Sequence, residues 1–319
     1  MSSVLIGTLS SMISLSVILL IAAQGEAFVE KSGQFNMGIE GIMISSALCA
    51  FVATYFSRSI VAGIVAGAIS GAVFGYVNFW LIERIHISAV LVGIVFNLLA
   101  GGVTGFLAEI CVNGSNAPLQ SKKIANISIP VLSQIPYIGK ILFRQNLIVY
   151  LAFLAVPLIH YYLFHTKGGL YIRAVGEGET AAQTMGINVT HVKRKCFVIG
   201  GIAAGISGAY CSLTLGLFMD KMTENKGFIA MALCAFSRQN PIGIFIGALF
   251  FALVDSIQIR LQLFNSGIPY EFMVCLPYVL TIVAVLFTSD RFRLRTLNRK
   301  KKAVNGIEKR EEEEPEYFI

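Results

Sequence analysis

The sequence has 319 residues, of which 55% are hydrophobic and 13% charged, with a net charge of +7 and a mean hydropathy of +0.73. Soluble domains carry about a quarter charged residues, so this composition excludes a soluble protein and indicates an integral membrane protein. One helical crossing needs about 20 apolar residues, which leaves room for roughly eight to ten crossings and no separate catalytic domain. We therefore expect an all-α, polytopic bundle of about 8–10 transmembrane helices, including short or re-entrant segments.

The cysteines and histidines show no spacing typical of a metal site or a disulfide framework. Six cysteines are scattered through apolar runs without C-x-x-C spacing, so we interpret them as small packing residues. The four histidines lie near expected helix ends, in no metal-ligand pattern. We expect this chain to bind no metal.

The N-terminal part alternates between apolar and polar stretches. Residues 4–23 are long enough to span a membrane and have no Lys or Arg ahead of them, so we expect a retained helix rather than a cleaved signal. Residues 24–36 are too polar to cross lipid as an exposed helix and are interpreted as a surface loop or a re-entrant piece. The next run, 37–56, contains Glu40, which is costly there unless it is interfacial, paired or facing water.

The third apolar run, residues 60–81, carries glycines at a strict spacing of four: Gly63, Gly67, Gly71 and Gly75. At 3.6 residues per turn they stay on nearly one side of a helix, so they predict a groove for close helix packing. The fourth run, 87–111, contains Asn97. A hydrogen bond between helices is the favoured interpretation of Asn97, and a place on a solute pathway is the alternative.

The remaining chain contains one long stretch without a spanning pattern, residues 112–145, where three prolines predict an ordered extramembrane loop. Further spanning runs are expected at residues 147–165, 196–218, 242–263 and 272–287. A shorter apolar run at 227–236 has about half the length of a membrane crossing. The domain prediction is a transmembrane domain over 1–289 and a charged, disordered cytoplasmic tail over 290–319, with no role in binding nucleic acid.

The distribution of basic residues predicts which ends face the cytoplasm. The tail holds seven basic residues between 291 and 302, and Lys193, Arg194 and Lys195 form a second cluster, so both should be cytoplasmic. An even number of crossings must join these points, so the run 227–236 has to cross with its flanks. A crossing this short is stable only beside protein or a water-filled cavity, so we expect it to line a route. Counting backward makes the loop 112–145 external and the turn 83–86 cytoplasmic; the side of the N-terminus stays open.

Residues 171–189 form a polar segment between two long apolar runs. Its interior has the signals of one short helix, with carboxylates in the first turn, alanines that leave it smooth and a glycine at a left-handed C-terminal cap: Glu177, Glu179, Ala181, Ala182 and Gly186. Such a helix could dock into a groove of a soluble partner, because small side chains let two backbones approach closely. An ordinary solvated loop is the alternative.

Six motifs occur in order between about residues 24 and 262: Asn36-Met-Gly-Ile-Glu-Gly-Ile-Met43, Arg173-Ala-Val-Gly-Glu177, Ala181-Ala182, Met185-Gly-Ile-Asn188, Gly227-Phe-Ile-Ala-Met-Ala232 and Asn240-Pro241. Together they resemble the permease subunits of ABC importers of the branched-chain amino acid and simple-sugar superfamily. Within it they are most similar to the nucleoside and simple-sugar branch.

The resemblance implies a multi-pass subunit of the cytoplasmic (inner) membrane that is not itself an enzyme. Its implied partners are a second, related permease, an ATP-binding subunit that holds ATP and Mg, and an extracytoplasmic substrate-binding lipoprotein, with membrane lipid around them. The solute would be a nucleoside or a simple sugar. No Gly-x-x-x-x-Gly-Lys-Ser/Thr loop occurs in the sequence, so ATP must be hydrolysed by another chain.

The resemblance also assigns residues. The coupling segment, about 167–195, corresponds to the loop that sits in the ATPase cleft, and the matching positions are Gly176, Glu177, Ala181, Ala182, Gly186, Ile187 and Asn188. Polar groups and the short crossing give the candidate pathway residues Asn36, Glu40, Asn97, Gly227 and Phe228. The main alternative is an ion-coupled secondary transporter of a small polar solute that uses Glu40 and Asp255. A membrane enzyme is a further alternative, but the sequence shows neither a nucleophile paired with a base nor a cluster of metal ligands.

Overall fold

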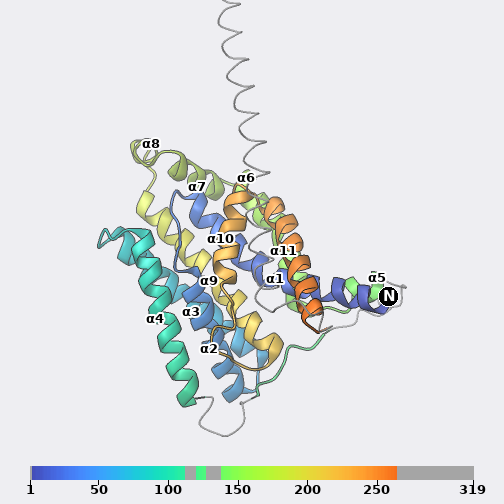
Figure 1. Ribbon diagram of the computed structural model, residues 1–319. Helices are drawn as coiled ribbons and strands as arrows, with labels where there is room; N and C mark the ends of the chain where they lie inside the picture. Colours follow the sequence, from blue (N-terminus) through green and yellow to red (C-terminus); the bar gives the residue numbers. More distant parts are fainter. Residues whose placement is uncertain (1, 112–119, 127–137, 264–319) are drawn as a thin grey trace, which may run out of the picture. The chain divides into compact units, whose positions relative to one another are not determined.

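The computed structural model describes residues 2–111, 120–126 and 138–263 (Figure 1). The described residues form α1 (Ser2–Lys31), α2 (Ile39–Ser57), α3 (Ile60–Glu83), α4 (Ala89–Cys111), α5 (Ile138–Leu142), α6 (Leu147–His165), α7 (Lys167–Glu177), α8 (Glu179–Thr184), α9 (Val189–Leu215), α10 (Lys226–Phe236) and α11 (Pro241–Leu263). Across these ranges the only β pairing is an isolated bridge between Asn126 and Asn146. The predicted all-α membrane fold is confirmed.

Seven of the described helices are long and apolar enough to cross a membrane, and α10 is a shorter apolar helix. The predicted run 147–165 coincides with α6, whose start is fixed by the Asn146 side chain accepting a hydrogen bond from the Val149 N–H at 3.2 Å. The predicted crossing 272–287 and the tail 290–319 lie outside the described residues. Contacts group the chain into Met1–Arg260 and Leu261–Ile319, and the second unit is described only over 261–263.

Helix α9 is the most buried of the seven spanning helices and packs against α1, α2 and α3. The four predicted glycines of α3 are all buried, and Gly67 and Gly71 face Gly201 and Gly205 of α9. A Cβ added at Gly71 would lie 2.8 Å from the Gly205 Cα, closer than real Cβ contacts come. The two backbones therefore meet directly, as small residues at helix interfaces in membranes allow.

The prediction for residues 24–36 was wrong over most of its length, because α1 stays helical to Lys31. Gln24, Glu26 and Glu30 are 3%, 0% and 7% exposed, so they lie inside the protein rather than on a loop. Other parts of the chain supply their hydrogen bonds: Gln24 donates to the Pro241 carbonyl at 2.9 Å, and Glu26 and Glu30 accept from the Asn36 N–H and the Gln239 amide. Protein shields these groups from lipid, so the helix can continue.

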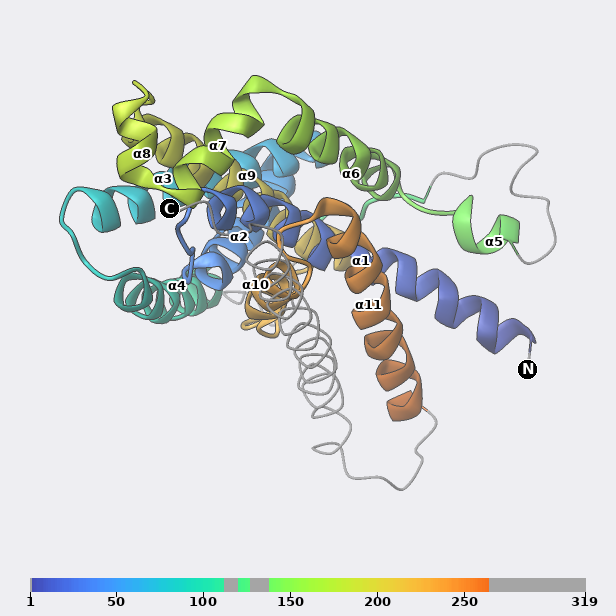
Figure 2. The same ribbon diagram turned by 90° about the horizontal axis from the view of Figure 1, so that it is seen from above.

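Long-range contacts define the two ends of the helical bundle. Lys193 at the start of α9 pairs with Glu83 at the end of α3, so the turn 83–86 and the basic cluster lie at one end, as predicted. The Ser121 N–H donates to the Gly216 carbonyl at 2.8 Å, which puts the described part of the loop 112–145 at the other end. Ser10 accepts from the Gln145 amide there, and α5 and the N-terminus lie far from α8 in both views (Figures 1 and 2). Which end is cytoplasmic stays a prediction.

Candidate functional site

Before α9 begins, the coupling segment forms two helices, α7 and α8, where one short helix was predicted. Helix α7 ends at Glu177, and Gly178 adopts an extended conformation (φ −172°, ψ 102°) before α8 begins at Glu179. The placement of Glu177 in the first turn of the short helix was therefore wrong; only Glu179 occupies that turn. The extended backbone at Gly178 interrupts the helical hydrogen bonding between Glu177 and Glu179. The sequence pattern, two carboxylates close together, does not show this interruption.

The predicted left-handed cap at Gly186 is confirmed. Gly186 has φ +81°, and its N–H donates to the Gln183 carbonyl at 2.9 Å while the Ile187 N–H donates to the Ala182 carbonyl at 3.0 Å. This pair of bonds is the Schellman motif. The Asn188 side chain then caps α9 by accepting from the His191 N–H at 3.0 Å. The turn from α8 to α9 is consequently closed by its own hydrogen bonds.

The two alanines of α8 lie on different faces, contrary to the smooth outer face predicted for both. Ala182 is 4% exposed and packs with Val175 and Val189, whereas Ala181 is exposed. Neighbouring residues of a helix point about 100° apart, so one of the two must turn inward when the helix rests on its own chain. Met185 at the end of α8 is 82% exposed and is the large apolar side chain that projects from this surface.

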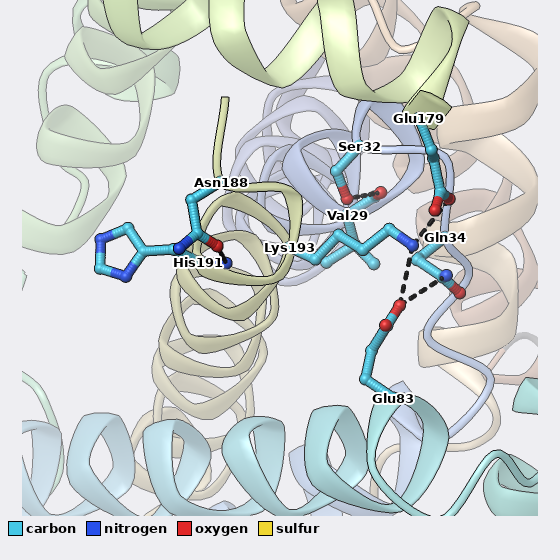
Figure 3. A network of polar contacts seen from close by, with 8 residues as sticks. All are labelled: Val29, Ser32, Gln34, Glu83, Glu179, Asn188, His191 and Lys193. Atoms are coloured by element: carbon cyan, nitrogen blue, oxygen red, sulfur yellow. Dashed lines mark hydrogen bonds and ion pairs between the residues drawn. The ribbon is translucent and has the colours of Figure 1, made fainter. Parts of the chain in front are cut away.

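Polar contacts tie the coupling segment to the membrane helices (Figure 3). The Lys193 ammonium, on a residue 3% exposed, lies 2.8 Å from Glu83 and 2.7 Å from Glu179. Glu83 also accepts from the Gln34 amide at 3.0 Å. A Cβ added at Gly176 would meet the Lys31 carbonyl and would lie 3.2 Å from the Gly33 nitrogen, so α7 rests on the backbone after α1. The segment is thus joined to α1, α3 and α9.

The candidate pathway residues gather where α2 and α10 begin. Glu40 accepts from the Gly227 N–H at 2.7 Å and the Asn225 N–H at 3.1 Å, and the Thr223 hydroxyl also donates to it. A carboxylate at this position satisfies donors left free by the first turn of α10 and suits the helix dipole. The chain runs from Gly216 at one end of the bundle to Gln239 beside Glu30 at the other, as the predicted short crossing requires; that this stretch crosses the membrane stays a prediction.

Asn36 and Asn97 hold the start of α2 in place. The Asn97 amide donates to the Met37 carbonyl at 2.9 Å and accepts from the Gly41 N–H at 2.7 Å, which confirms the favoured hydrogen bond between helices. Asn36 is 1% exposed and accepts from Asn78 at 3.2 Å. Phe228 is 39% exposed on α10. The structure brings these residues together, and their place on a solute route stays a prediction.

Lys193 is the residue whose importance the sequence reasoning missed. Its charge supported the prediction of which end faces the cytoplasm, but its burial was not predicted. Lys193 falls on the buried face of α9 together with Val189, Cys196, Phe197 and Gly200. That helical spacing could have indicated a buried lysine, and a buried lysine requires a carboxylate partner. Asp255, the second carboxylate of the ion-coupled alternative, is half-buried on α11. Within the described ranges no group of three or more His, Cys, Asp or Glu could hold a metal ion.

Comparison with known proteins identifies the family. The family model described as "Branched-chain amino acid transport system / permease component" matches residues 8–285. The chain belongs to this family. The permease is 33% identical over 280 residues to the guanosine ABC transporter permease protein of Bacillus subtilis, covering 84% of this chain and 87% of that protein. It is 32% identical over 257 residues to a candidate glucose ABC transporter permease of Haloferax volcanii, covering 80% of this chain and 78% of that protein.

The fold has a counterpart among solved structures. A chain of a transporter described as ABC-type and inward-facing aligns with a TM-score of 0.50 and 13% identity, covering 89% of this chain and 86% of that chain. At this identity the likeness concerns the fold alone. The protein is therefore a multi-pass permease subunit of an ABC transporter.

Proposed function

We propose that this permease pairs with a second, related permease and carries a nucleoside or a simple sugar inward across the cytoplasmic membrane. The energy comes from ATP and Mg held by a separate ATP-binding subunit, and an extracytoplasmic lipoprotein delivers the solute. The relatives named for guanosine and for glucose support these two solute classes. In this arrangement the coupling segment and the C-terminal tail face the cytoplasm, where the basic clusters support their placement.

The exposed surface of α8 is the observation that carries this proposal. Met185 is 82% exposed at a closed turn, and Ala181, Thr184 and Asn188 around it are also exposed. An apolar side chain projecting from a fixed turn can anchor in a pocket of a partner, since the backbone of the turn is already ordered before docking. Gly176, Glu177, Gly186 and Ile187 belong to the same segment, while Ala182 supports it from within.

The solute route is proposed beside α10. An eleven-residue helix is too short to span, and its first turn begins at Glu40 within the bundle. Irregular backbone at this depth is tolerated only beside protein or water. Because Glu40 and Asn97 are occupied by hydrogen bonds of the chain itself, we assign them to holding the half-helix, and Phe228 to the surface that the solute passes.

The test is retention of the ATP-binding chain on the purified permease. Met185→Glu and Ala181→Arg should lower retention by at least about tenfold, because each puts a charge into an interface centre. The elution profile of the permease should stay normal, since both side chains are exposed. Lys122→Glu, at the opposite end and also exposed, is the control and should retain the chain fully. Unchanged retention in both variants would show that α8 does not dock the ATP-binding chain.

A further inference from the structure

We propose that Lys193 is the positioning residue that transmits movement of the coupling segment to the pair of helices α3 and α9. Its ammonium contacts one carboxylate on the coupling segment and one at the end of α3, while its backbone belongs to α9 (Figure 3). This inference rests on the proposed function, since the movement would come from the ATP-binding subunit acting on α8.

The two ion pairs of Lys193 differ in exposure. The Glu83 side chain is 20% exposed and the Glu179 side chain 47% exposed, while that of Lys193 is 3% exposed. The contact with Glu179 is therefore the outer one, and solvent can replace it when α8 moves. The contact with Glu83 is the inner one, and it still balances the lysine charge when Glu179 moves away. Lys193 thus carries a pull from α8 for as long as the Glu179 contact holds, and it is not left unpaired inside the protein if that contact breaks.

What Lys193 holds on the inner side is a rigid unit. Gly71 and Gly75 of α3 meet Gly201 and Gly205 of α9 through their backbones, and the Phe79 ring packs on Phe197 at the next turn toward Lys193. Close-packed interfaces of this kind move together rather than deform. A force on the Lys193 side chain therefore acts on α3 and α9 together.

The other attachments of the coupling segment lead elsewhere. Gly176 rests on the backbone at Lys31 and Gly33, which belongs to α1 and its following turn. Ala182 packs with Val175 and Val189, which stabilises the segment itself and the first residue of α9. In the part of the chain that the structure describes, Lys193 makes the ion pairs that join α8 to α3.

The experiment reconstitutes the permease with its ATP-binding subunit and partner permease in liposomes, with guanosine and glucose as probe solutes. Uptake and ATP hydrolysis are measured together for wild type, Glu179→Gln, Lys193→Met and Lys193→Arg. Uptake per ATP hydrolysed should fall by about fivefold or more in Glu179→Gln and Lys193→Met, while retention of the ATP-binding chain and ATP hydrolysis stay near wild type. Lys193→Arg should restore the ratio, because a guanidinium can also contact two carboxylates.

A merely structural lysine would give a different pattern. It would lower uptake and hydrolysis in proportion to folded protein, and Lys193→Arg would not restore the ratio. Glu179→Gln keeps Lys193 and Glu83 paired, so the inference remains testable if Lys193→Met fails to fold. The double variant of Glu179→Gln and Lys193→Met should be no worse than Lys193→Met alone, because Lys193→Met already removes the contact with Glu179.

Three outcomes are decisive. An unchanged uptake per ATP in Glu179→Gln overturns the inference. A loss of the same size in Lys122→Met, an exposed lysine at the opposite end, also overturns it. Failure of the wild-type permease to retain any ATP-binding chain would instead overturn the proposed function, so the two failures are distinguishable.

Discussion

The α3–α9 interface and the coupling segment both contain several glycines, but the glycines serve different purposes. Between α3 and α9 they remove side chains so that two backbones meet inside the membrane, as at Gly71 and Gly205. In the coupling segment Gly178 breaks a helix and Gly186 reverses the chain at φ +81°. The first region leaves no space for adjustment. The coupling segment is held by ion pairs between long side chains, and a substitution or a movement of α8 at the surface can break them.

The comparison teaches where this permease tolerates substitution. At the α3–α9 interface the sequence is constrained by the space between backbones, since a Cβ added at Gly71 or Gly75 would collide with a carbonyl oxygen and a Cα of α9. On the coupling segment the constraint alternates from residue to residue, since Ala181 is exposed and Ala182 buried. Substitutions in the two regions should therefore fail in different ways.

The largest effect is expected inside the membrane. Gly71→Leu should lower the free energy of unfolding by about 3 kcal/mol or more and the yield of folded permease with it, because the side chain would have to displace α9. Thermal unfolding in detergent measures the change. Gly101→Leu on α4 is the matched control, since a Cβ at Gly101 meets no atom within 4 Å. Equal yields for the two variants would remove the packing argument.

An intermediate effect is expected at the buried side of α8. Ala182→Arg should destabilise the segment by about 2 kcal/mol, because the long side chain would have to displace Val175 or Val189 before its charge reaches water. Limited proteolysis should then cut the coupling segment while the membrane helices remain protected. Ala181→Arg, one residue earlier and exposed, should resist the protease as wild type does. Cleavage of both variants alike would contradict the division of α8 into an inner and an outer face.

The smallest effect on stability is expected on α10. Phe228→Cys, in a background with the six native cysteines replaced by alanine, should cost about 1 kcal/mol or less and react quickly with a charged, water-soluble thiol reagent. Ile69→Cys is the comparison, because Ile69 is 59% exposed and belongs to an apolar stripe of α3 that faces outward. A slower reaction at Phe228 than at Ile69 would mean that α10 faces lipid and not a water-filled route.

Sequence patterns predicted those parts of the fold that depend on local signals. Helix α6 was found at its observed bounds because polar residues flank an apolar run of spanning length, and the Gly186 cap was found because few residues adopt φ > 0. The error at 24–31 has a different origin. Gln24, Glu26 and Glu30 are polar enough to end a crossing, and only the distant residues that bond them reveal that α1 continues.

The candidate site was predictable to a similar extent. Asn36, Glu40, Asn97 and Gly227 were selected as polar or unusual positions, and the structure brings them together at the start of α2 and α10. Their hydrogen-bond partners could not be predicted, because Glu40 and Gly227 are 187 residues apart in the chain. The sequence likewise did not predict that the Ala182 side chain faces inward, since two adjacent alanines give no amphipathic pattern.

The Glu40 cap has a consequence for how this protein enters the membrane during synthesis. Helix α10 has eleven residues, too few for a translocon to release it into lipid as a finished crossing. Its first turn needs a carboxylate that was translated 187 residues earlier, on a helix that must already be in place. Residues 216–239 therefore complete their crossing only after α2, which carries Glu40, is in place. This step of biogenesis depends on tertiary contacts and not on the hydrophobicity of α10 alone. A chain that lacked residues 1–57 would lose the carboxylate that caps the first turn of α10.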